Sequence, residues 1–433
     1  MKVLSAFFLC FFVLLAPVSA SRQTIAIKAG RLVDTDRGDV FKNQIILVNG
    51  VRVEQVGENL SIPEGARIID LSAMTVLPGL IDCHTHLTDE TVLDPVVELQ
   101  KTACQKALEA VPYARRTLMA GFTTVRDVGC YRALVDIALR DAIARGDIVG
   151  PRMFAAGAYV TITGGGGALT GQAPDITLPW DLKFGQADGP LEVRKRVREL
   201  AHRGADFIKI LATGAVLTHG SNPDFQEFTL EEMQAAVAEA KKFGLKVAAH
   251  AHGSNGIKDA VRAGVASIEH GTHLDSEGIE MMKARGTYLV ADIYNEEYIQ
   301  GEGKARGMPE DFLAHDRELG RIQRENFKRA AQAGVKMAFG TDAGVFPHGQ
   351  NARQFAFMVK YGLTPMQAIQ SATINSARLL GKEFEIGSIK PGKYADLIAV
   401  DGDPLEDVSR LENIRFVMKD GTVFKRTVFK NKD

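Results

Sequence analysis

The sequence of 433 residues has little cysteine and almost no net charge, and each shortage excludes a class of protein. Apart from Cys10, the cysteines are Cys83, Cys104 and Cys130, an odd and widely spaced set that forms no disulfide framework. We therefore expect these three to be buried thiols. A formal net charge of −1 creates no overall field toward nucleic acid or an anionic membrane, so we expect no nucleic-acid partner. The glycine run at residues 164–167 is followed by no Gly-Lys-Ser/Thr, which excludes a phosphate-binding loop of that type.

Residues 1–20 differ in composition from the rest of the chain. Lys2 supplies a positive start, residues 3–16 are almost continuously apolar, and residues 18–20 have the small side chains that signal peptidase requires. The apolar run is shorter than the ~20 residues that span a bilayer, which favours a secretory signal peptide over an uncleaved anchor. We predict cleavage after Ala20 and an exported protein, periplasmic in a bacterium or secreted, with no membrane attachment after cleavage.

The rest of the chain divides into two β-rich ends and a long alternating middle. Residues 21–77 and 381–433 show short β-type runs between turn residues and no helical periodicity. In residues 78–380, short apolar strands alternate with amphipathic stretches of helical length. The predicted strands are residues 80–84, 123–127, 152–156, 207–211, 246–250, 267–270, 288–292 and 336–340. This alternation predicts an α/β protein: a (β/α)₈ TIM barrel at 78–380 with a small β-sandwich domain formed from both termini.

The clearest predicted helix covers residues 230–243. Thr229 stands before its first apolar position as an N-cap, and Glu232 follows three residues later, which is the capping-box pattern.

Histidines gather at the predicted strand ends. His84 and His86 close the first strand, where alternate side chains share a face and therefore point together toward the barrel mouth. His250 and His270 end the fifth and sixth strands, and Asp342 follows the eighth. Functional residues of such barrels lie at the C-terminal ends of the strands, and imidazole and carboxylate are metal ligands. The pattern predicts a metal site, although buried structural histidines and a helix-capping Asp342 are the alternative.

Lys209 strengthens this interpretation. It lies between Ile208 and Ile210, which we expect to face the helices, so Lys209 points into the barrel. Burial disfavours an ammonium and lowers the pKa of the amine. A neutral amine can take up CO₂, and the resulting carbamate can bridge two cations. The alternative is a lysine paired with Asp127 or Asp342.

Together these motifs resemble the binuclear amidohydrolase superfamily. The resemblance rests on residues 78–86 (Pro-Gly-Leu-Ile-Asp-Cys-His-Thr-His), on Lys209 between two isoleucines, on His250, on Ile-Glu-His-Gly at 268–271 and on Gly-Thr-Asp at 340–342. It extends to residues 391–397 and is strongest toward the imidazolonepropionase-related branch. That branch includes secreted zinc dipeptidases and carboxypeptidases that cleave Xaa-Arg/Lys or Xaa-Pro bonds, and amidohydrolases that release phenylalanine from ochratoxin A. Residues 292–295 and 341–349 look close to the Xaa-Arg/Lys group.

The resemblance implies a ligand set and a mechanism. His84, His86 and Asp342 would hold the more buried zinc ion, and His250 and His270 the other. N6-carboxylated Lys209 and a hydroxide would bridge the two Zn²⁺. The hydroxide would attack the carbonyl of an amide next to a C-terminal amino acid, in a dipeptide or an N-acyl amino acid such as ochratoxin A. Asp342 would be the catalytic residue that accepts the proton and passes it to the leaving amine.

Substrate contacts are predicted from position and from the same resemblance. His252 shares a strand face with His250, and His348 lies in the loop after the eighth strand, where a structural role is the alternative. Tyr294 belongs to a run that looks like the Xaa-Arg/Lys group. Some relatives have a histidine where this chain has Gly166, and a tyrosine near the position of Phe228.

Two other functions are weighed against amide hydrolysis. A one-metal deaminase or hydrolase of a cyclic amidine, of the imidazolonepropionase type, would use a glutamate three residues after the histidine of the fifth strand, where this chain has Gly253. A non-enzymatic scaffold would have no reason to keep all six ligands. We expect a small-molecule or dipeptide substrate, and the resemblance implies a homo-oligomer.

Overall fold

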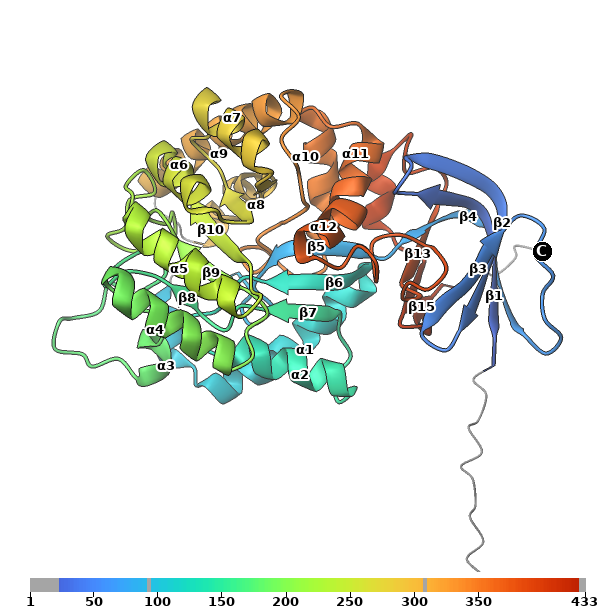
Figure 1. Cartoon of the computed structure of the whole chain (residues 1–433), viewed down its shortest axis with the longest axis horizontal. Coiled ribbons are helices and arrows are strands. Elements are labelled where there is room, and N and C mark those ends of the chain that lie inside the picture. Colours follow the sequence, from blue (N-terminus) through green and yellow to red (C-terminus); the bar gives the residue numbers. More distant parts are fainter. Residues whose placement is uncertain (1–22, 92–94, 307–309, 428–433) are drawn as a thin grey trace, which may run out of the picture.

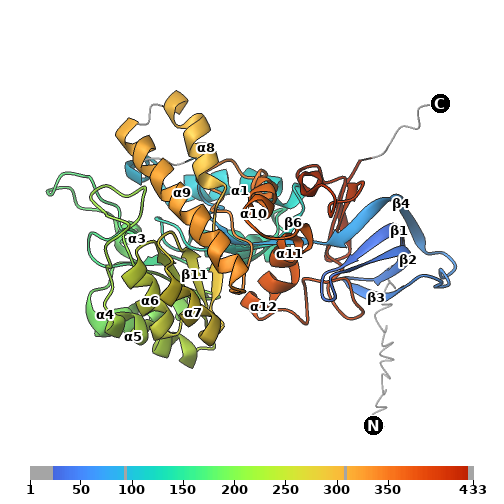
Figure 2. The same cartoon turned by 90° about the horizontal axis from the view of Figure 1, so that it is seen from above.

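A computed structural model describes residues 23–91, 95–306 and 310–427 of the chain. A barrel of strands and surrounding helices adjoins a smaller, strand-rich unit at one side (Figures 1 and 2). The smaller unit contains both the first and the last described strands, so the two ends of the chain meet there. The signal peptide predicted at residues 1–20 lies outside the described residues.

The smaller unit is one continuous seven-stranded sheet. Its strand order is β15-β14-β13-β4-β1-β2-β3, with β1 and β4 parallel and the other neighbours antiparallel. Apolar side chains from both halves, among them Ile27, Ile69, Leu397 and Phe416, pack into one core. The expected union of both termini is therefore present as a single curled sheet. The strands are β1 (Ile25–Asp34), β2 (Asp39–Asn49), β3 (Arg52–Gly57), β4 (Arg67–Pro78), β13 (Leu397–Asp401), β14 (Phe416–Lys419) and β15 (Thr422–Arg426).

The barrel strands are parallel and fully buried in most positions, as strands covered by helices on one side and packed inside a barrel should be. Two sheets form its wall, in the orders β5-β6-β7 and β12-β11-β10-β9-β8. The predicted TIM barrel is confirmed. Its strands are β5 (Leu80–Thr85), β6 (Phe122–Asp127), β7 (Arg152–Ala155), β8 (Tyr159–Val160), β9 (Ile208–Leu211), β10 (Val247–Ala251), β11 (Ser267–His270) and β12 (Tyr288–Val290).

Three predicted strands differ from the structure, and one of them, the seventh, expected at residues 288–292, ends at Val290. The third stops at Ala155 because Gly157 has a φ of +82°, and the chain resumes as β8, which pairs with β9 instead of β6. The eighth, expected at residues 336–340, is not a regular strand and has only a bridge from Met337 to Leu289. It still closes the barrel, since the amide of Cys83 donates to the carbonyl of Phe339 at 2.7 Å.

Helices follow most of the barrel strands and cover the outside (Figure 1). The predicted capping box is present: Thr229 accepts from the amide of Glu232, and the helix that follows ends at Lys242, one residue before the prediction. The helices are α1 (Ala103–Met119), α2 (Val135–Arg145), α3 (Trp180–Lys183), α4 (Gly189–His202), α5 (Leu230–Lys242), α6 (Ser254–Ala263), α7 (Ser276–Arg285), α8 (Asn295–Glu302), α9 (Glu310–Gln332), α10 (Gln354–Lys360), α11 (Pro365–Gln370) and α12 (Ser376–Leu380).

The thiols are not all buried. Cys83 and Cys130 are, and Cys83 packs against Ala377 and Leu379 as expected for a side chain that faces the outer helices. Cys104 is exposed, so that expectation was wrong: it lies in the first turn of α1, on the solvent side.

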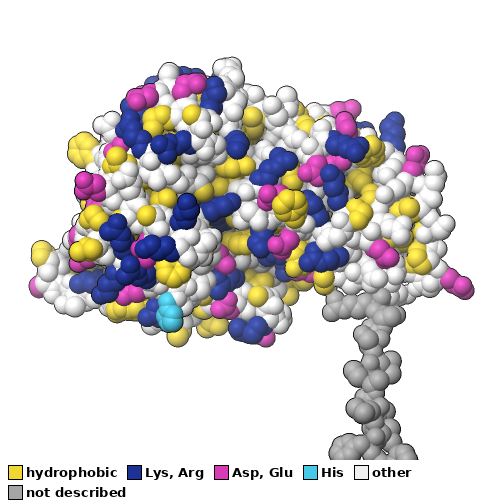
Figure 3. Space-filling model, viewed as in Figure 1, with side chains coloured by type: hydrophobic (Ala, Val, Ile, Leu, Met, Phe, Trp, Pro, Cys, Tyr) yellow, Lys and Arg dark blue, Asp and Glu magenta, His cyan; other side chains and the backbone are white. Residues whose placement is uncertain are grey.

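The helices and the surface of the protein are both consistent with the low net charge and the ordinary hydrophobic content of the sequence. Within the described ranges, no helix is both long enough and apolar enough to cross a bilayer. On the face drawn in Figure 3, basic and acidic side chains are interspersed with apolar ones.

Candidate metal centre

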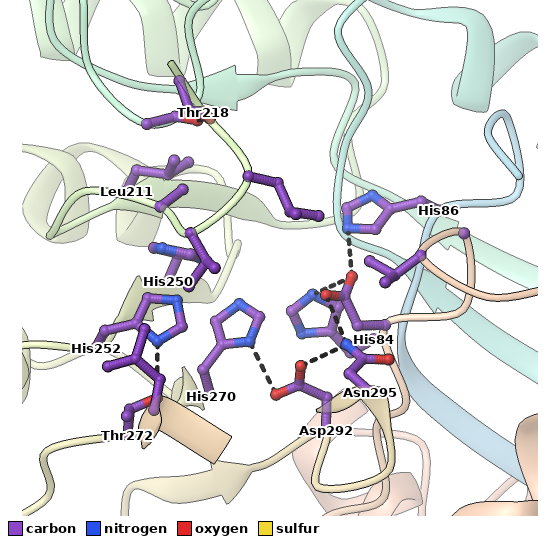
Figure 4. Close-up of a pocket in the computed structure, with 18 of the residues that line it drawn as sticks. His84, His86, Leu211, Thr218, His250, His252, His270, Thr272, Asp292 and Asn295 are labelled. Carbon is purple, nitrogen blue, oxygen red and sulfur yellow. Dashed lines mark hydrogen bonds and ion pairs between the residues drawn. The ribbon is translucent and has the colours of Figure 1, made fainter. Parts of the chain in front are cut away.

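One cavity opens at the C-terminal ends of the barrel strands, and it contains the six side chains predicted as metal ligands. Its volume is about 1160 Å³, including its open mouth. The parallel strands bring together residues that lie far apart in sequence because all their carboxyl ends meet at one rim (Figure 4). The six are His84, His86, Lys209, His250, His270 and Asp342.

The first donor group consists of His84, His86 and Asp342. Oδ1 of Asp342 lies 3.4 Å from Nε2 of His84 and 3.1 Å from Nε2 of His86. Ligand atoms bound to a tetrahedral zinc at 2.0–2.2 Å are about 3.3–3.6 Å apart. Nδ1 of His86 donates to the carbonyl of Gly129 at 2.8 Å, so Nε2 is the nitrogen that faces Asp342 and could bind a metal ion. The spacing and the tautomer both fit a metal ion.

The second donor group consists of His250, His252 and His270, whose candidate ligand atoms lie within 4.8 Å of one another. Nε2 of His250 donates a hydrogen bond to the carbonyl of Gly214 at 3.0 Å. Its Nδ1 therefore carries the lone pair that could bind a metal ion. His84, His270 and Asp342 also meet the 4.8 Å limit, and the ring centroids of His84 and His270 are 4.9 Å apart. The two groups are therefore adjacent, and His270 lies close to the ligand atoms of both.

A buried ion pair orients His84. Nδ1 of His84 donates to Oε2 of Glu269 at 2.9 Å, and Arg126 donates to the other carboxylate oxygen at 2.7 Å. Arg126 also donates to the carbonyl of Cys83 and to Ser267. Burial alone would raise the pKa of Glu269, but Arg126 and His84 hold it well below its usual range. An ionised Glu269 fixes the tautomer of His84, with Nε2 toward Asp342.

A second network orients His270. Its Nδ1 donates to Oδ1 of Asp292 at 2.9 Å, and Gln323 of α9 donates to the same oxygen at 2.8 Å. Asn295 donates to Oδ2 of Asp292 at 2.7 Å and to Oδ2 of Asp342 at 3.1 Å. Asn295 therefore connects the partner of His270 with the carboxylate of the first donor group (Figure 4).

Lys209 is 2% exposed and lines the cavity, as its position between two buried isoleucines predicted. Among the described residues it forms no ion pair with Asp127, Asp342 or any other carboxylate within 4.0 Å. Burial lowers the pKa of its amine to about 8. Lys209 pairs with Ala248 of β10, the strand that carries His250, and it lines the same cavity as both donor groups.

The backbone is strained at two of the predicted ligands. Asp342 has a φ of +58° and His270 a φ of +69°, a region that residues with a Cβ rarely adopt. Such conformations persist where surrounding contacts fix them, and they concentrate at functional sites.

Burial would raise the pKa of Asp342, but His84 and His86 hold it well below its usual range, so the carboxyl is an anion.

The predicted substrate contacts divide into two sets. His252 and Gly166 line the cavity, and Nδ1 of His252 shares a hydrogen bond of 2.8 Å with Thr272. Tyr294, His348 and Phe228 are not among the residues that line it. The hydroxyl of Tyr294 accepts from Arg353, His348 stacks on Tyr113 and donates to the carbonyl of Asp89, and Phe228 is buried in the hydrophobic core.

Several other residues that line the cavity were not predicted from the sequence. Tyr131 and Tyr159 approach from the segments after β6 and β7, and the hydroxyl of Tyr159 is 3.1 Å from Nδ1 of His86. Glu296 of α8 and Asp316 of α9 also line the cavity. None of these four residues lies in a sequence motif. For Glu296 and Asp316, the one signal in the sequence was their position between the last two barrel strands, where loops form part of the rim.

The protein is a parallel barrel with two adjacent groups of imidazole and carboxylate donors at its mouth. This combination is typical of an enzyme, and the site is compatible with bound divalent metal ions. The chain matches the Amidohydrolase family over residues 75–424, and it belongs to that family. It is accordingly a hydrolase that acts on amide or peptide bonds.

Three similar proteins illustrate the range of the family. Ochratoxinase of Aspergillus niger is 31% identical over 434 residues, which cover 95% of this chain and 88% of that protein. A solved structure of a Xaa-Pro dipeptidase with methionine bound in its active site is 41% identical with a TM-score of 0.88, and the match covers 93% of this chain and 100% of that one. Imidazolonepropionase of Deinococcus radiodurans is 25% identical over 389 residues, covering 86% of this chain and 88% of that protein.

Proposed function

We propose that this protein is a binuclear zinc hydrolase that cleaves the amide bond between an acyl group and a C-terminal amino acid, in a dipeptide or an N-acyl amino acid such as ochratoxin A. The observation that carries the proposal is that His84, His86 and Asp342 lie beside His250 and His270 in one cavity, which Lys209 also lines. One group would hold each zinc, and N6-carboxylated Lys209 would bridge them. Two zinc ions, when bound, polarise a carbonyl and lower the pKa of water toward ~7.

The residues of the chain have separate tasks in this reaction. Asp342 is the proton carrier: its carboxyl is ionised, and its Oδ2 has one described hydrogen-bond donor, Asn295, which leaves capacity to accept a proton. The amine that leaves needs that proton, and Asp342 returns it. Asn295 and the strained backbone hold the carboxylate in place meanwhile.

The choice of a C-terminal amino acid as the leaving group is supported by the relatives. Ochratoxinase and a Xaa-Pro dipeptidase with bound methionine both match this chain over more than nine-tenths of its length. His252 and the backbone of Gly166 line the cavity beside the donor groups and are candidates to contact the substrate carboxylate or the scissile carbonyl.

The backbone argues against an amidine deaminase. A Cβ built on Gly253 would lie 2.4 Å from the carbonyl oxygen of Asp224, so a glutamate does not fit three residues after His250 without a shift of main chain. Lys209 has no task in a one-metal deaminase.

The test is a measurement of metal content and of hydrolysis together. We expect about two zinc ions per chain by mass spectrometry, and release of free amino acid from a panel of dipeptides and N-acyl amino acids. Loss of both on chelation and recovery on adding zinc with bicarbonate would support a carboxylated lysine. Hydrolysis that persists in fully chelated protein would refute the metal mechanism.

We also propose that the protein is exported and forms a homo-oligomer. The support for export is the composition of residues 1–20, and Edman sequencing of the secreted or periplasmic protein should begin at Ser21. Sedimentation of the mature protein as a monomer at all concentrations would exclude the oligomer.

A further inference from the structure

The strand β12 and the irregular segment at residues 336–340 separate just before the donor groups. Main-chain hydrogen bonds join them as far as Ala338, whose amide donates to the carbonyl of Leu289 at 3.1 Å. In the part of the chain that the structure describes, no main-chain hydrogen bond joins residues 290–293 to residues 339–342. These two stretches contain Asp292, which orients His270, and Asp342 of the first donor group. A β ladder therefore does not fix the spacing between the two carboxylates.

Gln354, the first residue of α10, lies in this gap. Its side chain is fully buried, and Nε2 donates to the carbonyl of Ala291 at 3.1 Å and to the carbonyl of Gly340. Both hydrogens of the amide group are thereby used, one on each side of the gap. Its Oε1 accepts no hydrogen bond from the described residues, so the two carbonyls set the orientation of the amide. Ala291 directly precedes Asp292, and Gly340 stands two residues before Asp342.

The other side of the eighth segment is held by main chain and by close packing. The amide of Asp342 donates to the carbonyl of His84 at 2.8 Å, which joins the segment to β5. A Cβ built on Gly340 would lie 2.2 Å from Cγ1 of Val290 and 2.8 Å from Cβ of His84, so the backbone at Gly340 is in direct contact with both neighbouring strands. A side chain that binds the carbonyl of Gly340 is therefore placed to control how far Asp342 lies from β12.

Packing holds the start of α10 independently of the amide group of Gln354. The ring of the next residue, Phe355, has its centroid 4.5 Å from that of Phe339, and both side chains are fully buried. We therefore expect α10 to stay against the eighth segment when the amide of Gln354 is replaced by an apolar group.

We propose that Gln354 is a positioning residue: its amide group sets the distance between the strand ends that carry Asp292 and Asp342, and thereby the spacing of the two donor groups. Gln354 is not among the residues that line the cavity, so it acts through the main chain and not on the substrate. This inference rests on the proposed function, because the spacing matters for a pair of metal ions bound together.

The test replaces Gln354 with methionine, which has a similar length and no hydrogen-bond donor. Metal-free protein is titrated with Mn²⁺ in the presence of bicarbonate and observed by EPR, because the magnetic coupling between two Mn²⁺ ions depends on their separation. In the wild type we expect a coupled pair. Gln354→Met should bind the first ion with an affinity within about threefold of the wild type and the second about tenfold more weakly or worse, with a reduced or altered coupled spectrum.

Gln370→Met is the matched control, because Nε2 of Gln370 also donates to a main-chain carbonyl, that of Thr35 at 2.9 Å, far from the donor groups at the junction with the seven-stranded sheet. It should leave the Mn²⁺ affinities and the spectrum unchanged. Gln354→Glu is a second variant, because burial favours the protonated carboxyl, which donates to one of the two carbonyls. Its second affinity should lie between those of the wild type and Gln354→Met.

Two results would overturn the inference. One is an unchanged second affinity and spectrum in Gln354→Met, or in Gln354→Glu if the methionine variant does not fold. The other is an equal change in Gln370→Met, which would indicate a general loss of stability.

A failure of the proposed function is distinguishable from a failure of the positioning role. If the wild type binds no pair of ions, the binuclear function is wrong, and hydrogen exchange of the metal-free proteins tests the role of Gln354 alone. Faster exchange at residues 288–295 and 338–345 in Gln354→Met than in Gln370→Met would support that role, and equal exchange would reject it.

Discussion

Replacement of Arg126 by methionine tests whether the ion pair behind His84 holds the site together. Met has a similar length but no charge, so Glu269, which is fully buried, would keep a carboxylate without its cation. The guanidinium donates hydrogen bonds to three partners: Glu269, Ser267 and the carbonyl of Cys83. Removing one partner of a buried ion pair destabilises a protein by about 3–5 kcal/mol.

The pH dependence has a definite sign. Glu269 has a depressed pKa in the folded protein, so its ionisation contributes stability above its unfolded pKa of about 4.3 that is lost at lower pH. Without Arg126 the pKa of the buried carboxyl would rise. The destabilisation of Arg126→Met should therefore be larger at pH 8 than at pH 5.

The assay is urea denaturation of the metal-free protein in a double-mutant cycle. Arg126→Met should lower the free energy of unfolding by about 3 kcal/mol or more alone, and by less in a Glu269→Gln background, where no charge is left unpaired. Zinc affinity should fall about tenfold to a hundredfold because the orientation of His84 is lost. A loss below 1 kcal/mol, or the same loss in both backgrounds, would refute the role given to this pair.

Three further predictions concern single residues of the cavity. Asp342→Asn should lower kcat by ~10²–10⁴-fold with zinc retained, since it removes the proton carrier; full activity in a rate assay would dismiss that role. Lys209→Ala should bind less zinc by mass spectrometry. Because burial lowers the pKa of Lys209 to about 8, reactivation of apoenzyme by zinc and bicarbonate should be faster at pH 8.5 than at pH 6.5, and a flat profile would contradict this. Asp316→Asn should raise the melting temperature relative to wild type at pH 8.5 but not at pH 4. The pKa of Asp316 is raised to about 7 in the folded protein, so its ionisation opposes folding as pH rises. The upper bound of the resulting stabilisation is about 4 kcal/mol.

The barrel and the meeting of the six candidate ligands at its mouth were predictable because both follow from local patterns and one topological rule. Apolar runs of four to six residues marked the strands, and the parallel arrangement places every strand end at one rim. The position of Lys209 followed from the period of two along a strand. The capping box at Thr229 predicted the start of α5 because it depends on neighbouring residues alone.

What could not be predicted depends on the path of the chain between strands. Tyr294 stands two residues after Asp292, yet its side chain turns to Phe346 and Arg353 outside the cavity. Asp316 lies on a helix far from any motif and reaches the cavity because α9 packs beside α8 (Figure 2). The end of the third strand at Ala155 depended on the positive φ of Gly157, which the apolar pattern does not encode.

The pairing of β4 with β13 has a consequence for the synthesis of the chain. Pro78 and Leu397, which face each other in that ladder, are separated by roughly 320 residues. Until the ribosome has delivered the last tenth of the polypeptide, β4 has a bare edge of unpaired amide and carbonyl groups next to apolar side chains, which is the kind of edge that recruits foreign strands. A product truncated before residue 397 would therefore be expected to aggregate, even with every residue of the catalytic cavity already translated.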